Sequence, residues 1–302
     1  MKISIIFIGE LHDHGFNECA FQGAKRMRET GKAEIKIVSD IPYDQAIMAD
    51  ALHKAARTSQ GVIFVGGQGN LVMPHLALNF PDQSFAVVQG SVIGPNLASY
   101  DVLQEQSAFL AGVAAARLTR TGIVGHLSGH RVAPGLKGRA AFAAGVRYID
   151  KRIDLITGFC GSQDDNAVAQ RWSAAIANAG ADILFTMLNA ARSGVIDTCR
   201  AIGMRQIGNA ADWCAVDPAV FVASAVARID LGVDRAVIDL LAGRSPDQIE
   251  HLDLGQGAVE LTCAPDVPSA VVEEIKAKAT LISRGQLHVD TTYEGPEFEL
   301  GR

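Results

Sequence analysis

Polar and glycine-rich segments follow directly after the apolar runs of this 302-residue sequence. Their acids, amides and aromatic rings could bind a small molecule through directed hydrogen bonds and stacking. The segments are Asp13-His14-Gly15-Phe16-Asn17, Gly66-Gly67-Gln68-Gly69-Asn70, Gln89-Gly90-Ser91, Ser128-Gly129-His130, 160–165, Asn189-Ala190 and 210–213. None of them has the spacing of a metal site or an evident pair of nucleophile and base. The expected chemistry is therefore ligand recognition.

The first three segments supply five candidate ligand-binding residues. Phe16 could stack on a planar ligand, or instead cap the core between strand and helix. Asp13 and Asn17 could hydrogen-bond the same ligand, although both residue types also cap helices. Gln68 lies between glycines, which favours close approach of the backbone to a neutral ligand. Gln89 both donates and accepts, which suits an amide-like or heterocyclic ligand; its alternative role is a hydrogen bond at the sheet end.

The later segments supply four more candidates. Asp164 and Asp165 are adjacent, so they cannot both face one site from a regular helix, and one of them is expected to cap the following helix. Asn189 directly follows a buried run. Asp212 and Trp213 together would suit an aromatic or cationic ligand. The alternative for Trp213 is a position at the edge of a lobe, half-buried under the next loop.

Potential nucleophiles and metal ligands are present, but not in catalytic arrangements. Ser128, Cys160 and Cys214 lack a nucleophile elbow such as G-x-S-x-G, so structural roles are favoured. The five cysteines are an odd number without C-x-x-C spacing, which argues against a disulfide framework or a zinc site. A hydrolase or dehydrogenase would need an acid cluster or a complete dinucleotide motif. We therefore expect no catalytic residue, no cofactor and no metal, and hence no enzyme.

Short apolar runs alternate with longer amphipathic patterns along the chain. They predict the strands and helices that position these segments. We predict strands at Ile3–Ile8, Glu34–Val38, Gly61–Val65, Ser84–Val88, Gly122–Leu127, Leu155–Gly158, Ile183–Thr186 and Arg205–Asn209. Predicted helices are Asn17–Thr30, Tyr43–Thr58, Leu71–Asn79, Gln104–Arg117, Gly138–Ile149, Asn166–Ala179, Arg192–Ile202, Phe221–Leu241 and Ser269–Ser283. This alternation predicts doubly wound parallel sheets, with the candidate residues at the carboxyl ends of the strands. Glu294–Arg302 is polar, and we expect a tail with little structure of its own.

Composition narrows the class of protein further. With 302 residues, 48% of them hydrophobic, about two domains are expected. The formal net charge of −6 argues against nucleic-acid binding, which usually shows a basic excess. The run Met1–Gly9 is too short for a signal peptide with its own apolar region, and it is interpreted as the first buried strand. The chain is thus expected to be cytoplasmic, or to have had an export signal trimmed.

Several segments resemble the basic membrane protein (BMP) family, the substrate-binding proteins of ABC importers that include purine-nucleoside receptors. Residues 13–17 followed by Gly23 are similar to its D-x-S-F-N…G segment, and residues 96–125 resemble its most distinctive stretch. Further similar segments are 142–146, 180–183, 193–196 and 224–230. The resemblance covers residues 1–289 in order.

The resemblance implies a type I periplasmic-binding-protein fold, an α/β fold with two doubly wound parallel-sheet lobes joined by a three-segment hinge. By analogy, the N-terminal lobe is 1–118 plus 222–249, and the C-terminal lobe is 119–221 plus 250–302. The ligand would bind between the lobes, and Asp164 would match an acidic position of the family. The implied partners are a small-molecule ligand and an ABC transporter permease. A monomer in the periplasm or cell envelope is implied, with no nucleic acid.

Three departures bear on the ligand. Gln89 stands where nucleoside-binding members end the fourth strand with aspartate, and Ala227 stands where they have lysine in S-x-V-K. Where they have G-V-D-S-D-Q, residues 208–213 keep only the second acid, Asp212. Carboxylates usually grip a ribose diol through charge-assisted hydrogen bonds. The resemblance still implies a heterocyclic ligand, and the expected ligand is a purine nucleoside, a base or another heterocycle. The alternative function is a cytoplasmic ligand sensor on the same scaffold.

Overall fold

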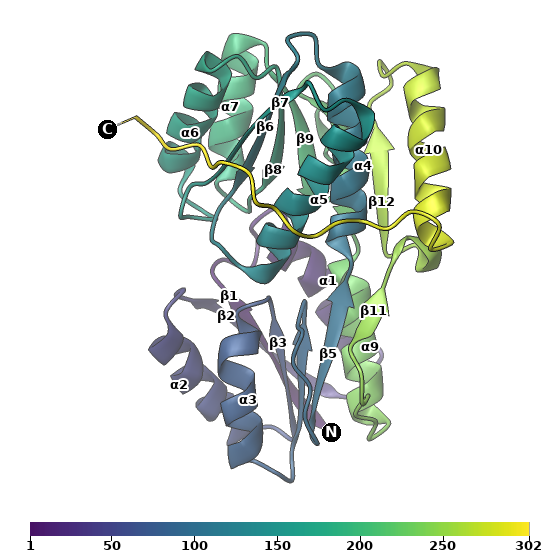
Figure 1. The fold of residues 1–302 in the computed structure, drawn as a ribbon. Coiled ribbons are helices and arrows are strands. Elements are labelled where there is room, and N and C mark those ends of the chain that lie inside the picture. The colour runs from purple at the N-terminus through teal and green to yellow at the C-terminus, as the bar shows by residue number, and fades with distance from the viewer. Residues whose placement is uncertain (302) are drawn as a thin grey trace. The chain divides into compact units, whose positions relative to one another are not determined.

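The computed structural model of the protein describes residues 1–301. It contains two compact units, and each is assembled from two segments of the chain. The first unit comprises Met1–Val102 and Arg228–Leu252, and the second comprises Leu103–Ala227 and Asp253–Arg302. The chain therefore passes between the units three times. Each unit has a six-stranded sheet with helices on both faces (Figure 1).

The sheet of the first unit is entirely parallel. Its strands are β1 (Lys2–Ile8), β2 (Glu34–Ile41), β3 (Gly61–Val65), β4 (Ser84–Val88), β5 (Leu97–Val102) and β11 (Glu250–Leu252). The strand order is β11-β5-β4-β3-β1-β2. All five residues of β3 are buried, as expected for a central strand covered by helices on both faces.

Helices flank this sheet in two pairs. They are α1 (Phe16–Glu29), α2 (Gln45–Ala56), α3 (Gly69–Asn79) and α9 (Ile229–Leu241). α1 packs against α9, and α2 packs against α3. The helix α9 comes from the second segment of the unit, so the α1–α9 contact joins the two segments.

The second unit has a mixed sheet with the order β12-β10-β9-β8-β6-β7. Its strands are β6 (Ile123–Ser128), β7 (Asp154–Phe159), β8 (Ile183–Met187), β9 (Arg205–Ala210), β10 (Phe221–Ala227) and β12 (Val259–Cys263). Only β12, at one edge, runs antiparallel to its neighbour among the paired strands of residues 1–301.

The helices of the second unit also lie on both faces of its sheet. They are α4 (Gln104–Leu118), α5 (Ala133–Ile149), α6 (Asn166–Asn178), α7 (Arg192–Ile202), the short α8 (Trp213–Val216), a 3₁₀ turn (Leu254–Gln256) and α10 (Ser269–Ser283). α4 packs against α5 and α10, and α6 packs against α7. A Cβ on Gly112 of α4 would lie 2.2 Å from the Phe142 carbonyl oxygen, so glycine permits the close approach of α4 and α5.

The first five strands of each sheet follow the same order. Read from one side, β2-β1-β3-β4-β5 in the first unit corresponds to β7-β6-β8-β9-β10 in the second. In each sheet the order reverses beside the first strand, between β1 and β3 and between β6 and β8. Ligands of doubly wound sheets bind outside the carboxyl ends of the strands at such a switch point. The fold thus marks one edge in each unit as a place for a ligand.

The sequence prediction lacks four of the observed strands. Residues 221–241 were predicted as one helix, but Phe221–Ala227 is strand β10 and α9 begins at Ile229. The prediction was wrong there because all seven residues of β10 are buried, and a short run of small apolar residues fits a buried strand as well as a helix. The strands β5, β11 and β12 were not predicted.

The unit boundaries also differ from the lobes expected from the family resemblance. Residues 104–118 and 222–227 were expected in the N-terminal lobe, but α4 and β10 belong to the second unit. The reason is packing: α4 contacts α5, β10 and β12, and β10 pairs with β9 and β12. Conversely, β11 pairs with β5 and completes the first sheet.

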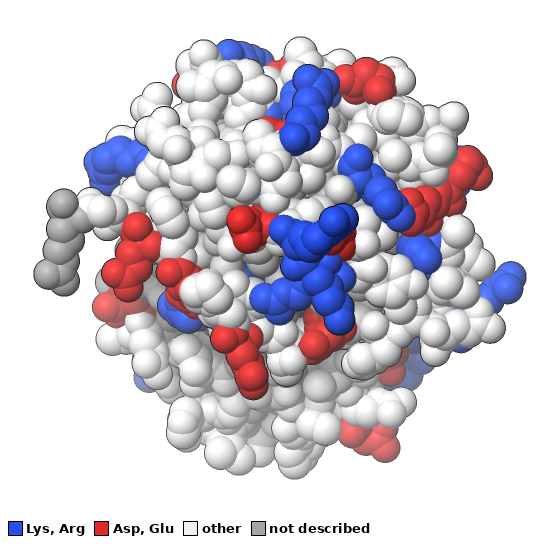
Figure 2. All heavy atoms as spheres, turned by 45° about the horizontal axis from the view of Figure 1, so that its top comes forward, with Lys and Arg blue, Asp and Glu red and all other residues white. Residues whose placement is uncertain are grey.

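Charged side chains of both signs are interspersed on the surface shown in Figure 2, where lysine and arginine lie beside aspartate and glutamate. On this face the basic side chains therefore have acidic neighbours. Within residues 1–301, none of the helices combines the length and apolarity needed to cross a membrane.

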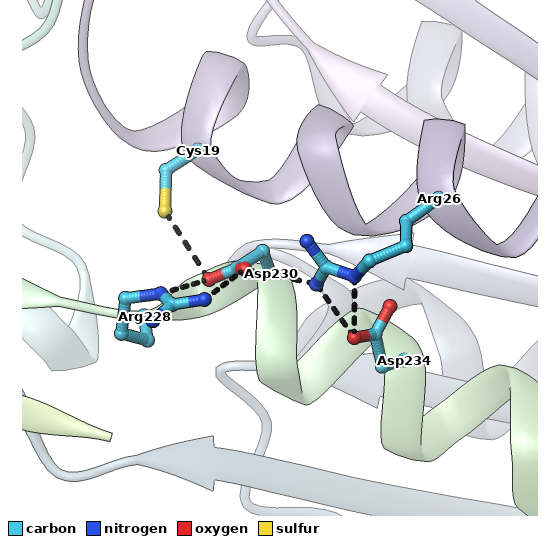
Figure 3. A network of polar contacts seen from close by, with 5 residues as sticks. All are labelled: Cys19, Arg26, Arg228, Asp230 and Asp234. Atoms are coloured by element: carbon cyan, nitrogen blue, oxygen red, sulfur yellow. Dashed lines mark hydrogen bonds and ion pairs between the residues drawn. The ribbon is translucent and has the colours of Figure 1, made fainter. Parts of the chain in front are cut away.

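A polar network joins the two segments of the first unit at the start of α9 (Figure 3). The carboxylate of Asp230, 3% exposed, accepts hydrogen bonds from Arg228 at 2.9 and 2.8 Å and from Arg26 of α1 at 2.9 Å. Arg26 also contacts Asp234 at 2.6 Å, and the Cys19 thiol lies 3.8 Å from Asp230. Burial alone would raise the pKa of Asp230, but these arginines outweigh it and lower the pKa.

Candidate ligand-binding site

The loop after β1 is built around Asp13. Its side chain is fully buried, and its carboxylate accepts hydrogen bonds from the backbone N–H groups of Gly15 at 2.8 Å, Asn17 at 2.9 Å and Glu18 at 3.1 Å. Asp13 therefore caps the amino end of α1 in this structure, as its alternative role predicted. Such a carboxylate holds the loop in place and can influence ligand binding by fixing the shape of the loop.

Asn17 and Phe16 occupy the first turn of α1. The Asn17 amide donates to the carbonyl oxygens of Ile8 at 2.8 Å and Glu10 at 2.9 Å, so it ties the helix back to the end of β1. Phe16 is half-buried at the carboxyl end of the sheet. An aromatic ring at this edge can stack on a planar ligand.

Gln68 lies in the loop after β3, on the other side of the switch point of the first sheet. Its side chain folds back over Gly66, because a Cβ at Gly66 would lie only 2.4 Å from the Gln68 Oε1 atom. Gly66 has a φ of +122°, a conformation that favours glycine. The Oε1 atom is buried and has no hydrogen-bond partner within residues 1–301. A buried acceptor without a donor costs free energy, and a ligand N–H could satisfy it after a side-chain rotation.

Gln89 ends β4 in the left-handed region, with a φ of 63°. Its N–H donates to the Tyr100 carbonyl oxygen at 2.7 Å, and its Oε1 accepts from the Val102 N–H at 2.7 Å. The side chain thus extends the β4–β5 ladder beyond the strand, which is the sheet-end hydrogen bond considered from the sequence. Its remaining amide hydrogens are the part that a ligand could use.

In the second unit the loops after β7 and β8 meet. The Asn189 N–H donates to the Gln163 carbonyl oxygen at 3.2 Å, and the Asp164 carboxylate lies 3.4 Å from the Ala190 N–H. The structure therefore brings together two candidates, Asp164 and Asn189, that are 25 positions apart in the sequence. Asp165 caps α6, because its carboxylate accepts a hydrogen bond from the Val168 N–H at 3.0 Å. The prediction that one of the two adjacent acids caps the following helix is therefore confirmed for Asp165.

Trp213 is packed into the second unit by three contacts. Its ring stacks on Phe221 with centroids 5.4 Å apart and an interplanar angle of 29°. The Arg192 guanidinium carbon lies 4.5 Å from its ring centroid, and its Nε1 donates to the Asn209 carbonyl oxygen at 3.2 Å. The indole thus closes a cluster at the ends of β8 and β9. This packing agrees with the alternative, half-buried position.

Asp212 precedes Trp213 and is exposed. Its carboxylate accepts from the Thr262 hydroxyl at 2.8 Å and lies 3.4 Å from the Ala215 N–H at the start of α8. The acid therefore connects α8 with the edge strand β12. Its side chain and that of Trp213 share a turn but have separate partners.

Two residues near these loops were not among the nine candidates: Arg192, which was not considered from the sequence, and His130, whose segment was included. Arg192 is 2% exposed and donates to the Asn209 Oδ1 at 2.6 Å and to the Leu188 carbonyl oxygen. The signal for it was a lone cation three positions after Asn189, directly after a buried strand. His130 follows β6 at the switch point of the second sheet, where burial lowers its pKa and the nearby Asp164 carboxylate opposes that shift.

The cysteine and serine side chains considered as nucleophiles are held in structural surroundings. Burial raises the pKa of the Cys160 and Cys214 thiols, so the thiolate form is disfavoured at neutral pH. The Ser128 hydroxyl is buried and lies 2.9 Å from the Nε2 atom of His126. Among residues 1–301 the structure gathers no group of three His, Cys, Asp or Glu side chains that could hold a metal ion.

Residues 1–291 match the family described as ABC transporter substrate-binding protein PnrA-like. The chain belongs to this family. The predicted resemblance to basic membrane proteins is thereby confirmed. The family consists of solute-binding proteins, and the match covers both units and all nine candidate ligand-binding residues.

Relatives of known name agree with this assignment. The chain is 26% identical to Basic membrane protein A of Borreliella burgdorferi over 206 residues, which are 67% of this chain and 60% of that protein. It is 25% identical over 199 residues to the ABC transporter nucleoside-binding protein BmpA of Lactococcus lactis, with 64% and 56% covered. The match thus spans less than two thirds of these relatives. It is also 20% identical over 265 residues to the transcriptional activator protein med of Bacillus subtilis, with 86% and 81% covered.

Solved structures confirm the predicted fold class. An ABC transporter solute-binding protein from Aeropyrum pernix K1 superposes with a TM-score of 0.85 at 19% identity, over 97% of this chain and 94% of that one. A solute-binding protein from Conexibacter woesei superposes with a TM-score of 0.70 at 21% identity, over 96% and 99%. The protein therefore has the α/β type I periplasmic-binding-protein fold.

Proposed function

We propose that this protein binds a purine nucleoside or a related heterocycle and delivers it to the permease of an ABC importer. The observation that carries the proposal is the family match over residues 1–291. Polar side chains at the carboxyl ends of both sheets support it, because this is where doubly wound sheets bind ligands. The role is binding and not catalysis, and no cofactor takes part.

Four of the nine candidates are proposed to contact the ligand directly. In the first unit, the half-buried Phe16 stacks on the heterocycle, and Gln68 turns its amide oxygen towards a ring N–H. In the second unit, Asn189 supplies an amide and Asp164 a carboxylate for ligand hydroxyl groups. The other five candidates have backbone or side-chain partners that fix the shape of these loops, and they act mainly by positioning them. These are Asp13, Asn17, Gln89, Asp212 and Trp213.

Delivery requires that the permease distinguish the loaded protein from the empty one. A ligand that binds one conformation of the protein more tightly than another shifts the protein towards that conformation. The permease would then recognise the conformation that the ligand favours. The proposed location is the cell envelope, and the proposed working form is a monomer.

A thermal-shift screen of purified protein tests the ligand class. Nucleosides, free purine bases, sugars and amino acids would be compared at equal concentration. A compound at 100 times its Kd should stabilise the protein by about 2.7 kcal/mol, which raises the melting temperature measurably. We expect a purine nucleoside or base among the hits. Failure of every purine compound to shift melting or to bind in calorimetry would overturn the ligand class.

The Gln68 contact can be tested in the same assay. The substitution Gln68→Leu should weaken binding of the hit compound by about tenfold or more, the loss expected for a buried hydrogen bond to a ligand. Melting without ligand should stay the same or rise, because the buried Oε1 atom has no hydrogen bond to lose and its removal relieves an unsatisfied acceptor. Gln22→Leu, at an exposed position of α1, is the control and should bind normally. Equal affinity of the two variants would remove Gln68 from the proposed site.

A second function, a cytoplasmic ligand sensor, is favoured by two comparisons. The match to the activator med covers 86% of this chain, and a Bacillus halodurans activator of the comK gene superposes with a TM-score of 0.76 at 17% identity, over 93% of this chain and 98% of that one. With a net charge of −6, such a sensor would act through a protein partner. Cell fractionation separates the functions: a chain found in the envelope fraction excludes the sensor, and one found only in the cytoplasm excludes the importer role.

A further inference from the structure

The C-terminal segment lies along the surface of the second unit. After α10 the chain runs on without helix or strand, and Figure 1 shows it crossing α5 towards α6. Residues 294–302 were expected to be a tail with little structure of their own, but the side chains of Glu297 and Phe298 contact several elements. Tyr293, just before this tail, contacts Arg139 and Arg147.

The Glu297 carboxylate is held by two arginines. Arg131, in the loop between β6 and α5, donates to its two oxygens at 2.6 and 2.9 Å, in the bidentate geometry that carboxylates favour. Arg139 of α5 makes a third contact to the same carboxylate. The hydrogen bonds from Arg131, opposed by desolvation and supported by Arg139, lower the pKa of Glu297 to about 2. Glu297 is therefore charged throughout the neutral range.

Arg139 is a buried part of this site. It is 6% exposed, and its guanidinium carbon lies 5.0 Å from the ring centroid of Phe159 and 4.6 Å from that of Tyr293. Its Nε atom is buried without a hydrogen-bond partner within residues 1–301. An arginine that is removed from water in this way needs an anion beside it. The tail supplies that anion through Glu297.

Phe298 docks beside the acid. Its N–H donates to the Thr157 carbonyl oxygen of β7 at 2.8 Å, and β7 is an edge strand of the second sheet. Its ring meets Trp172 of α6 at 6.1 Å between centroids and 70° between planes. Gly158 makes room for Trp172, because a Cβ there would lie 2.3 Å from the indole. A main-chain bond to a sheet edge together with a side-chain contact is a recurring mode of peptide binding.

We infer that Arg131, Arg139, Thr157, Phe159 and Trp172 form a docking surface for an extended segment in which an acid precedes an aromatic residue. We call these five residues the tail-docking surface. In this structure the chain's own Glu297-Phe298 is the occupant, and the same segment supplied by another molecule can replace it. Because Arg131 belongs to the loop after β6, occupancy also holds that loop at the carboxyl end of the sheet. This inference does not depend on the proposed ligand.

Hydrogen exchange on the full-length chain tests the docking in place. Glu297→Gln keeps the shape of the side chain and removes its charge, and Glu299→Gln makes the same change at an exposed position two residues away. We expect exchange at least tenfold faster than in the unsubstituted chain in residues 293–299 and in loop 129–132 for Glu297→Gln. Glu299→Gln should exchange like the unsubstituted chain. If the two variants exchange alike, the docking surface is refuted.

A labelled peptide of residues 290–301 tests replacement of the occupant. It would be titrated by fluorescence anisotropy against the full-length chain carrying Glu297→Lys and Phe298→Ser, in which the arginines repel the tail. We expect saturable binding that is at least tenfold tighter than binding to the unsubstituted chain, whose own tail competes at high effective concentration. A peptide with Gln in place of Glu297 should bind at least tenfold more weakly.

Two results of the peptide experiment would contradict the proposal. One is the absence of binding to a double variant whose circular dichroism and cooperative thermal unfolding match those of the unsubstituted chain. The other is equal affinity for the two peptides, which would remove the carboxylate from recognition. If the double variant does not fold, the hydrogen-exchange comparison of Glu297→Gln with Glu299→Gln decides the question.

Discussion

His126 of β6 is a fully buried imidazole whose two nitrogens both have hydroxyl partners. Nδ1 lies 2.8 Å from the Thr157 hydroxyl, and Nε2 lies 2.9 Å from the Ser128 hydroxyl. The rings of Phe142, Phe159 and Phe185 surround it. Burial, together with the positive charge of Arg139, lowers the pKa of His126 to about 3. The imidazole is therefore neutral in the folded protein.

A buried neutral histidine makes stability depend on pH. In the unfolded chain His126 takes up a proton near pH 6.5, but in the folded chain only near pH 3. Its contribution is thus complete above pH 6.5, and it falls by about 1.4 kcal/mol for each pH unit below that value. Urea unfolding followed by tryptophan fluorescence measures this effect in the second unit, because both tryptophans, Trp172 and Trp213, lie there.

His126→Gln should remove much of this pH dependence. Glutamine can hydrogen-bond both hydroxyls without titrating. Relative to the unsubstituted chain, the variant should gain about 2–3 kcal/mol between pH 6.5 and pH 4.5. His75→Gln, at an exposed position of α3, should leave the pH dependence unchanged. Parallel pH profiles for the unsubstituted chain and His126→Gln would show that His126 is not the source.

The sequence predicted which loops carry polar side chains, but not which atoms remain available. Asp13 and Gln89 illustrate the limit, because their residue types suit both a ligand and the backbone, and the structure shows backbone partners. Trp213 could equally have faced a ligand, and its partner Phe221 was assigned to a helix. The burial of Arg192 depends on how β8, β9 and α8 converge, which no local pattern contains.

At the scale of elements, the α1–α9 contact depends on the Asp230 network. Asp230→Asn should destabilise the first unit by about 2–3 kcal/mol, below the 3–5 kcal/mol of a fully buried pair, since Arg26 and Arg228 are partly exposed. Asp50→Asn breaks the exposed pair with Lys54 and should cost less than about 1 kcal/mol. Thermal unfolding followed by circular dichroism measures the loss of stability in both variants. Equal losses would show that the Asp230 network does not stabilise the α1–α9 contact.

The α4–α5 contact depends on glycine at its crossing point. A Cβ on Gly145 would lie 2.1 Å from the Phe109 carbonyl oxygen, so Gly145→Ala should destabilise the second unit by about 3 kcal/mol or more. Gly135 is in the same helix, and a Cβ there would lie 3.5 Å from its nearest neighbouring atom, the His130 carbonyl oxygen. Gly135→Ala should therefore be neutral or stabilising by up to about 1 kcal/mol. Urea unfolding by tryptophan fluorescence measures both, and a stable Gly145→Ala chain would contradict the close packing.

Elements with a strong period were predictable, and the weak ones were not. The helix Arg192–Ile202 was predicted with the observed bounds, because its apolar positions recur at helical spacing. By contrast, β11 has only three residues and β12 alternates weakly, and each is defined by the strand with which it pairs. The end of β10 at Ala227 coincides with a passage of the chain between units. Such a boundary arises from tertiary structure and leaves no local signal.

At the scale of the whole molecule, the proposed function predicts that a bound ligand stabilises the folded chain, by about 2.7 kcal/mol at 100 times Kd. Tryptophan fluorescence reports on the second unit, because both tryptophans lie there, and hydrogen exchange in β1 and β3 reports on the first. The absence of protection in both units at saturating ligand would contradict the proposed function.

The division of each unit into two segments has a consequence for biosynthesis. When residue 102 leaves the ribosome, the first unit has five of its strands but lacks α9 and β11, which cover and complete its sheet. Residues 103–227 must be made before those elements emerge. During translation the face of the first sheet that α9 will cover is therefore exposed apolar surface, a form prone to association with other chains. A nascent chain arrested shortly after residue 102 should be an efficient client of ribosome-associated chaperones.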